Sequence, residues 1–200
     1  MIDPWVGSDW GKPGNAIGGV RLLVLGESAH AAEHEVGSAP VDLLVKNVRE
    51  YINENPKWRF YRIATALITG KNTAELDQRA RAAAWESIAF SNYVPVVAAN
   101  YSRQRPTREM FAQGAEPFQQ LMGRLMPEAI VVLGFDTWGW MMHGLGLPGK
   151  HWDKPETPFA RVGPAIAARL SHPSRGFAYE RWRPIVSELL KRATPGRNTP

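Results

Sequence analysis

The stretch Arg21-Leu-Leu-Val-Leu-Gly-Glu-Ser-Ala-His30 decides the fold of this chain. Its apolar run stops at Gly26 and is followed at once by a carboxylate, which is typical of a buried parallel strand whose carboxyl end opens into a loop. Proteins that alternate strands with helices place their functional groups at such strand ends. We therefore expect Glu27 to lie at the edge of a sheet, next to a glycine that lets a ligand approach the backbone.

The rest of the chain alternates between strand and helix patterns. Apolar spacing predicts strands over 20–25, 87–94, 129–133 and 166–170, and helices over 41–52, 58–69, 73–85, 116–125, 138–145 and 181–192. This alternation predicts an α/β fold with three layers, α/β/α, around a central, mostly parallel four-stranded sheet. We expect one domain over 1–200, in which 1–19 is an irregular lead-in and 194–200 is disordered.

The composition indicates a basic protein without thiol chemistry. Lys and Arg number 24 against 19 Asp and Glu, which gives a net charge of +5 and favours an anionic partner. The chain has no cysteine, so disulfides, thiolate zinc sites and iron–sulfur clusters are excluded. No signal-peptide pattern and no apolar run of the roughly 20 residues that span a bilayer is present. We expect a cytoplasmic monomer that makes no contact with membranes.

Glu27 is the first candidate for catalysis. Its place after a buried strand predicts partial desolvation, which would suit a general base. The structural alternative is an ordinary loop or helix N-terminal carboxylate, and Ser28 offers a nucleophile in place of Glu27. His30, Glu33 and His34 have a spacing that could hold a metal, but they lie in a segment without helical pattern, and we expect no metal there.

Asn92 and Phe60 are candidates for binding a planar ring. Asn92 ends the strand over 87–94, and its amide can both donate and accept hydrogen bonds. The alternative is an asparagine that caps the turn before Pro95. Phe60 can stack on a base, or can be an ordinary core residue.

A second decisive segment, Leu170-Ser-His-Pro-Ser-Arg-Gly-Phe177, lies near the end of the chain. It predicts a tight turn that exposes backbone N–H groups beside His172, whose imidazole can stabilise developing negative charge. Its proline rigidifies the turn and leaves Ser174 and Arg175 to contact phosphate. A structural histidine is the alternative.

In chain order, Gly26-Glu27-Ser28, Asn92 and His172-Pro173-Ser174 resemble the motifs of the uracil-DNA glycosylase superfamily, and in particular the branch whose first motif is Gly-Glu-Ala. The resemblance implies that Glu27 orients the attacking water and that His172 stabilises the departing uracil anion. It also implies that Asn92 recognises uracil by hydrogen bonds and that Gly26 and Ser28 belong to the same binding site.

The segment Arg59-Phe60-Tyr61 is similar to the Arg-Phe-Trp of mismatch-specific relatives. This similarity implies that Phe60 stacks on the flipped base. By the same resemblance, Arg175 would occupy the loop that fills the gap left in the duplex.

The function that this resemblance implies is that of a monofunctional DNA glycosylase. Such an enzyme flips uracil out of DNA, hydrolyses its N-glycosidic bond without a cofactor, and so starts base excision repair. The chain departs from the Gly-Glu-Ala branch in lacking the four cysteines of its iron–sulfur cluster, and Ser28 and Ala29 replace the residues that usually complete the first motif.

Two alternatives remain open. The first is a glycosylase-like protein that binds DNA without cleaving it, which is favoured by two clusters of arginines, at positions 103, 105 and 108 and at positions 175, 181 and 183. The second is a serine hydrolase of the Gly-Asp-Ser-Leu type that uses Ser28 and His172. That family places an Asp three residues before its histidine, where this chain has Arg169.

Overall fold

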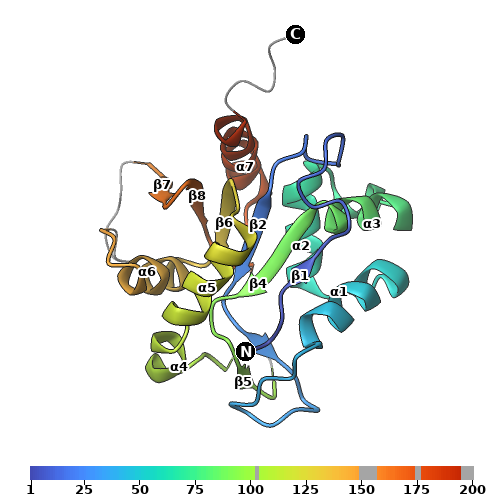
Figure 1. Cartoon of the computed structure of the whole chain (residues 1–200). Helices are drawn as coiled ribbons and strands as arrows, with labels where there is room; N and C mark the ends of the chain where they lie inside the picture. Colours follow the sequence, from blue (N-terminus) through green and yellow to red (C-terminus); the bar gives the residue numbers. More distant parts are fainter. Residues whose placement is uncertain (102–103, 149–156, 174–176, 195–200) are drawn as a thin grey trace.

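The structure, a computed structural model, describes residues 1–101, 104–148, 157–173 and 177–194. A mixed sheet of six strands forms its centre (Figure 1), in the order β1 (Trp5–Val6), β4 (Ile88–Asn92), β2 (Leu22–Gly26), β6 (Ala129–Leu133), β8 (Ala165–Leu170) and β7 (Phe159–Val162). The four internal strands run parallel, whereas β1 pairs antiparallel with β4 and β7 pairs antiparallel with β8. The α/β class is confirmed, but the prediction of four strands is wrong because two short antiparallel strands extend the edges.

The internal strands are apolar along their whole length. Every residue of β2 and of β6 is buried, as expected for parallel strands that are covered on both faces. Burying each large aliphatic side chain in this way contributes about 2 kcal/mol to folding. The sheet therefore holds the carboxyl ends of β2, β4, β6 and β8 in fixed positions.

Helices cover both faces of the sheet (Figure 1), with α1 (Leu43–Glu54), α2 (Arg59–Thr69), α3 (Gln78–Glu86) and α7 (Tyr179–Ala193) on one face and α4 (Arg108–Ala112), α5 (Ala115–Leu125) and α6 (Phe135–Gly144) on the other. Successive strand residues alternate between the two cores, so that Val24 and Phe90 face the first group of helices while Leu25 and Val132 face the second. In the core on the α2 side, aromatic rings of α2 pack directly against the sheet.

Several short elements were not expected from the sequence. They are β3 (Ala29–His30) and β5 (Val97–Ala99), which pair in a separate two-stranded parallel sheet, and the helix α4. The helix expected over 73–85 is divided into a 3₁₀ turn, η1 (Thr73–Glu75), and α3. The division falls at Asp77, whose side chain accepts a hydrogen bond from the Ala80 N–H at 2.7 Å and so caps α3.

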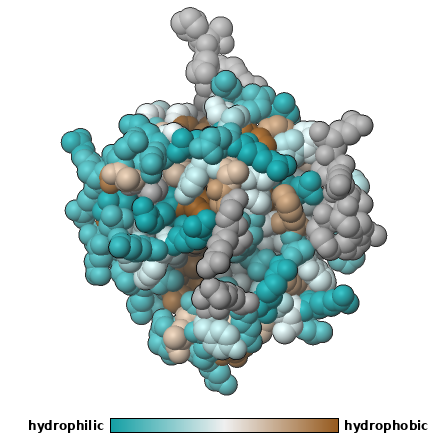
Figure 2. Space-filling view, turned by 180° about the vertical axis from the view of Figure 1, so that it is seen from behind, coloured by the Kyte–Doolittle hydropathy of each residue, from teal (hydrophilic) through white to brown (hydrophobic). Residues whose placement is uncertain are grey.

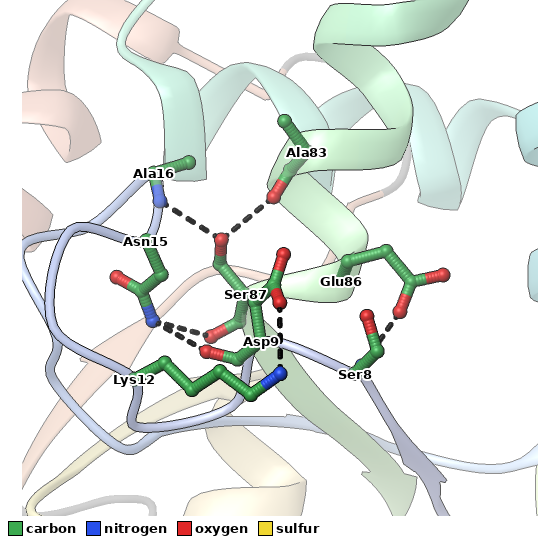
Figure 3. Close-up of polar contacts among 8 residues, drawn as sticks. All are labelled: Ser8, Asp9, Lys12, Asn15, Ala16, Ala83, Glu86 and Ser87. Carbon is green, nitrogen blue, oxygen red and sulfur yellow. Dashed lines mark hydrogen bonds and ion pairs between the residues drawn. The ribbon is translucent and has the colours of Figure 1, made fainter.

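The segment 1–19, expected to be an irregular lead-in, contributes β1 and is fixed to the junction of α3 and β4 (Figure 3). The hydroxyl of Ser87 accepts a hydrogen bond from the Ala16 N–H at 2.9 Å and donates one to the carbonyl of Ala83 at 2.7 Å. The side-chain amide of Asn15 donates to the carbonyl of Ser87 at 3.4 Å. These contacts tie the segment to the edge of the sheet farthest from β7.

On the face seen in Figure 2, hydrophilic residues predominate and hydrophobic atoms show only in small patches between them. Within the described part of the chain, no helix has the length and apolar character needed to cross a membrane.

Candidate functional site

The carboxyl ends of the four parallel strands gather the candidate residues at one edge of the sheet. Gly26 ends β2 and pairs in register with Asn92, the last residue of β4. Gly134 follows β6, and its N–H donates to the carbonyl of Leu170 at the end of β8, at 3.1 Å. His172 comes two residues later. We call Gly26, Glu27, Phe60, Asn92 and His172 the strand-end cluster.

Gly26 lies directly under two of these side chains. A Cβ atom built on Gly26 would overlap Oδ1 of Asn92 and would come within 3.2 Å of Cζ of Phe60. Only a glycine leaves room for both groups at this point. The Asn92 amide and the Phe60 ring are therefore brought together over the backbone of β2.

Phe60 belongs to a packed group of aromatic rings. Its ring centroid lies 5.2 Å from that of Phe90 on β4 and 5.5 Å from that of Tyr61, its neighbour on α2. Phe60 itself is only partly buried, whereas Phe90 and Tyr61 are buried behind it. The packing therefore fixes the Phe60 ring and leaves part of its surface open to a ligand.

Glu27 is held on the other side of Gly26. Its side chain is 10% exposed, and its Oε2 accepts a hydrogen bond from Nη2 of Arg105 at 3.2 Å. The same nitrogen of Arg105 also donates to Oδ2 of Asp136, in the first turn of α6. The hydrogen bond that Arg105 donates to Asp136, together with the negative charge of Glu27, raises the pKa of the Arg105 guanidinium. The expected Glu27 site thus includes an arginine and a second carboxylate.

His172 lies beside Gly134. A Cβ built on Gly134 would come 3.8 Å from Cδ2 of His172, and the φ of this glycine, 132°, is one that other residues rarely adopt. Although His172 keeps exposed surface, desolvation by the surrounding protein lowers the pKa of its imidazole. The negative charge of Glu27 opposes this shift, whereas the positive charge of Arg105 and the electrostatic effect of His30 add to it. These effects together favour the neutral form of the ring at pH 7.

The remaining predicted residues are placed differently. The hydroxyl of Ser28 is buried and makes no hydrogen bond within the described residues. Ser174 and Arg175, expected to contact DNA, lie outside the described residues, as does the segment 195–200 that was expected to be disordered.

His30 has a different contact from that of His34 and Glu33. Nε2 of His30 lies 2.9 Å from the carbonyl of Gln104, whereas Nε2 of His34 lies 3.8 Å from Glu33. Throughout the described ranges, no three His, Asp or Glu side chains gather as metal ligands would.

Sequence reasoning missed Arg105 and Asp136. Arg105 stands out in the sequence only as one of several arginines close together, and Asp136 only as an acidic residue two positions after the Gly134 that stops a strand. Glu27 is 78 residues from Arg105 in the sequence, and no motif links them. The contact could be found only from the fold.

The cluster combines the kinds of group that bind a planar polar ring with one charged and one neutral polar group beside them. The amide of Asn92 offers a donor and an acceptor, the ring of Phe60 offers a stacking surface, and Glu27 and His172 offer a carboxylate and a neutral hydrogen-bond donor.

No protein-family model matches the chain, and none of the curated proteins compared with it matches either.

Proposed function

We propose that this protein is a monofunctional DNA glycosylase of the uracil-DNA glycosylase superfamily. The observation that carries the proposal is the meeting of the Asn92 amide and the Phe60 ring over Gly26. A uracil that lies on this glycine could stack on Phe60 and direct its imide edge to Asn92. In this proposal the protein acts as a cytoplasmic monomer, without a cofactor, on DNA that contains uracil.

Asn92 suits the recognition of uracil for a chemical reason. Uracil presents an N3–H donor and an O4 acceptor side by side, and an asparagine amide can accept from the first and donate to the second. No hydrogen bond between described residues involves the Asn92 side-chain amide. A base that enters would therefore meet polar atoms that are available to it.

The two flanking groups suit the cleavage step. As the bond between N1 of uracil and C1′ breaks, its electron pair leaves with uracil and positive charge grows on the sugar. His172, neutral at pH 7, donates a hydrogen bond to the uracil oxygen on which negative charge develops. Glu27 faces the sugar and orients a water whose oxygen bonds to C1′, while the water proton passes to solvent. The uracil anion then takes up a proton from solvent, so that the products are free uracil and an abasic site.

The charge of the chain agrees with a nucleic-acid substrate. The net charge of +5 favours association with phosphates, which offsets part of the few kcal/mol needed to extrude a base from the duplex. Neither the first nor the last motif contains a lysine that could form a Schiff base with the sugar. This supports hydrolysis by water rather than cleavage of the strand.

The alternatives receive less support from the geometry. The Gly-Asp-Ser-Leu type hydrolase needs a base bonded to Ser28, yet the hydroxyl of Ser28 is buried without a hydrogen-bond partner among the described residues. A DNA-binding relative without activity would have no need of a buried carboxylate and a neutral histidine around one site. It remains the second candidate because it would share the Asn92 and Phe60 contacts.

A cleavage assay tests the proposal. The protein is incubated with a labelled oligonucleotide that contains one uracil, single-stranded or paired with G or A, and half of each sample is then treated with alkali. We expect strand breaks only after alkali, because a monofunctional enzyme leaves an intact backbone at the abasic site. An oligonucleotide with thymine in place of uracil is the matched control.

The other outcomes identify the alternatives. Tight, salt-sensitive binding without cleavage would indicate the DNA-binding relative. Neither binding nor cleavage, together with labelling of Ser28 by a fluorophosphonate, would indicate the hydrolase. Breaks without alkali would contradict the monofunctional mechanism.

Gly26→Ala tests the packing on which the proposal depends. The new Cβ would overlap Oδ1 of Asn92, and because this atom ends a short side chain, Asn92 will move away rather than the strand unfold. We expect uracil excision to fall by about a hundredfold, as for other small displacements of positioning groups, while thermal unfolding changes little. Gly123→Ala is the control, since nothing lies within 4 Å of a Cβ at that position of α5. Equal activity of the two variants would contradict the proposed role of Asn92.

A further inference from the structure

Arg105 joins three parts of the chain at the edge of the strand-end cluster. It lies between β5 and α4, and its Nη2 donates both to Oε2 of Glu27, just after β2, and to Oδ2 of Asp136, at the start of α6. The next residue back, Gln104, accepts a hydrogen bond at its carbonyl from His30. The segment that carries Arg105 is thus itself fixed beside the cluster.

The exposure of the three groups indicates what the contact does. The side chain of Arg105 is 62% exposed, that of Asp136 is 32% exposed and that of Glu27 is 10% exposed. An arginine as exposed as this one adds little to the stability of a fold through its ion pairs. A buried carboxylate, in contrast, depends strongly on its cation. The contact with Arg105 therefore stabilises the buried Glu27 carboxylate and contributes little to the stability of the fold.

The arrangement also fixes the direction of Glu27. Arg105 binds Oε2, so that Oε1 is left to hold a water. Asp136 accepts a second hydrogen bond from the same nitrogen of Arg105, and α6 favours an acidic residue in its first turn, where the helix dipole is positive. The guanidinium is consequently fixed between two carboxylates and does not follow Glu27 if that side chain turns away.

We propose that Arg105, anchored by Asp136, is a positioning residue that holds the Glu27 carboxylate in the orientation needed to direct water at the sugar. The proposal rests on the proposed function for the identity of the reaction. The contacts themselves do not depend on it, and they can be tested without DNA.

The kinetic test uses Arg105→Gln, Arg105→Lys and Asp136→Asn, with excision of uracil measured in single turnover at saturating enzyme. We expect Arg105→Gln to slow the chemical step about ten- to hundredfold and to change the dissociation constant for DNA little. Arg105→Lys should recover part of the rate, because its charge remains while the planar shape and the reach of the guanidinium are lost. Asp136→Asn should lie between wild type and Arg105→Gln. Arg124→Gln, which removes an exposed charge at the far end of α5, should be unchanged.

A double variant separates positioning from DNA binding. If Arg105 acts through Glu27, Arg105→Gln will have no further effect in a Glu27→Gln background. The proposal would be overturned if Arg105→Gln slowed the chemical step of Glu27→Gln by the same factor as it slows that of the wild type. It would also be overturned if Arg105→Gln weakened DNA binding and left the chemical step unchanged, because Arg105 would then act on phosphate.

A titration of His172 by proton NMR, without DNA, gives the second readout. The positive charge of Arg105 lowers the pKa of His172 and the negative charge of Glu27 raises it, while His30 and desolvation also lower it. Removing the positive charge in Arg105→Gln should therefore raise the pKa of His172, and removing the negative charge in Glu27→Gln should lower it. The NMR signal of His172 is assigned from its absence in the spectrum of His172→Gln. If these shifts occur but the wild type excises no uracil, the proposed function has failed and the contact stands. If the wild type is active and Arg105→Gln shifts neither the pKa nor the rate, the positioning role is wrong.

Discussion

Replacing Asn92 with alanine should reduce uracil excision by about a thousandfold, the largest effect of any single change in the strand-end cluster. The amide supplies both hydrogen bonds to the imide edge of the base, so its loss removes a donor and an acceptor at once. Sites that read a polar edge by paired hydrogen bonds lose most of their discrimination when the pair is removed. The remaining activity should therefore distinguish uracil from cytosine poorly, because the donor and acceptor of the imide edge are what separate these two bases.

The fold should tolerate this change. Asn92 is the last residue of β4, it is only partly buried, and no hydrogen bond between described residues uses its side-chain amide. We expect the free energy of unfolding to change by less than about 1 kcal/mol. Asn53→Ala, which removes an exposed amide from α1, is the matched control and should leave excision unchanged. If Asn92→Ala retained full activity and selectivity, the base would have to be recognised elsewhere.

The main architecture could be predicted because the signals for it are local. The buried runs of β2 and β6 each contain five consecutive apolar or small residues, and each ends at or just before a glycine. Helices such as α2 and α5 carry clear helical spacing, so their predicted bounds differ from the observed ones by at most one residue. A pattern of this kind depends only on residues next to one another in the sequence.

The edges of the sheet could not be predicted, because they depend on pairing between distant segments. β1 has two residues, and its assignment depends on the antiparallel pairing of Trp5 with Phe90, 85 residues later in the chain. β3 and β5 are equally short, and they are strands only because they pair with each other. Elements of two or three residues have no detectable periodicity. The predicted sheet therefore had its central strands but lacked its edges.

The site could be predicted as far as the sheet positions it. Parallel strands end at the same edge, so Gly26 and Asn92 were expected there together, and the register pairs them. Phe60 comes from α2, and only the packing of that helix on β4 brings its ring over Gly26. Arg105 comes from an irregular segment whose course no local pattern determines.

His172→Ala should slow excision at least a hundredfold while the affinity for DNA that contains uracil is retained. The histidine acts on charge that exists only as the glycosidic bond breaks, so its loss affects the chemical step and not the binding of the intact substrate. Single-turnover rates and equilibrium binding, measured on the same oligonucleotide, separate the two. A parallel loss of binding would instead show that His172 holds the DNA.

The protonation state of His172 makes this prediction more specific. Desolvation lowers the pKa of its imidazole below the usual 6.5, and the neutral form accordingly predominates from pH 6.5 upward. A histidine that acted as a cation would lose activity as the pH rose through this range, whereas a neutral donor would not. The rate of excision by the wild type should thus not fall between pH 6.5 and 8, and His172→Gln, which keeps a neutral donor, should be more active than His172→Ala. A rate that falls with rising pH in the wild type, and not in His172→Gln, would show that the imidazolium is the catalytic form.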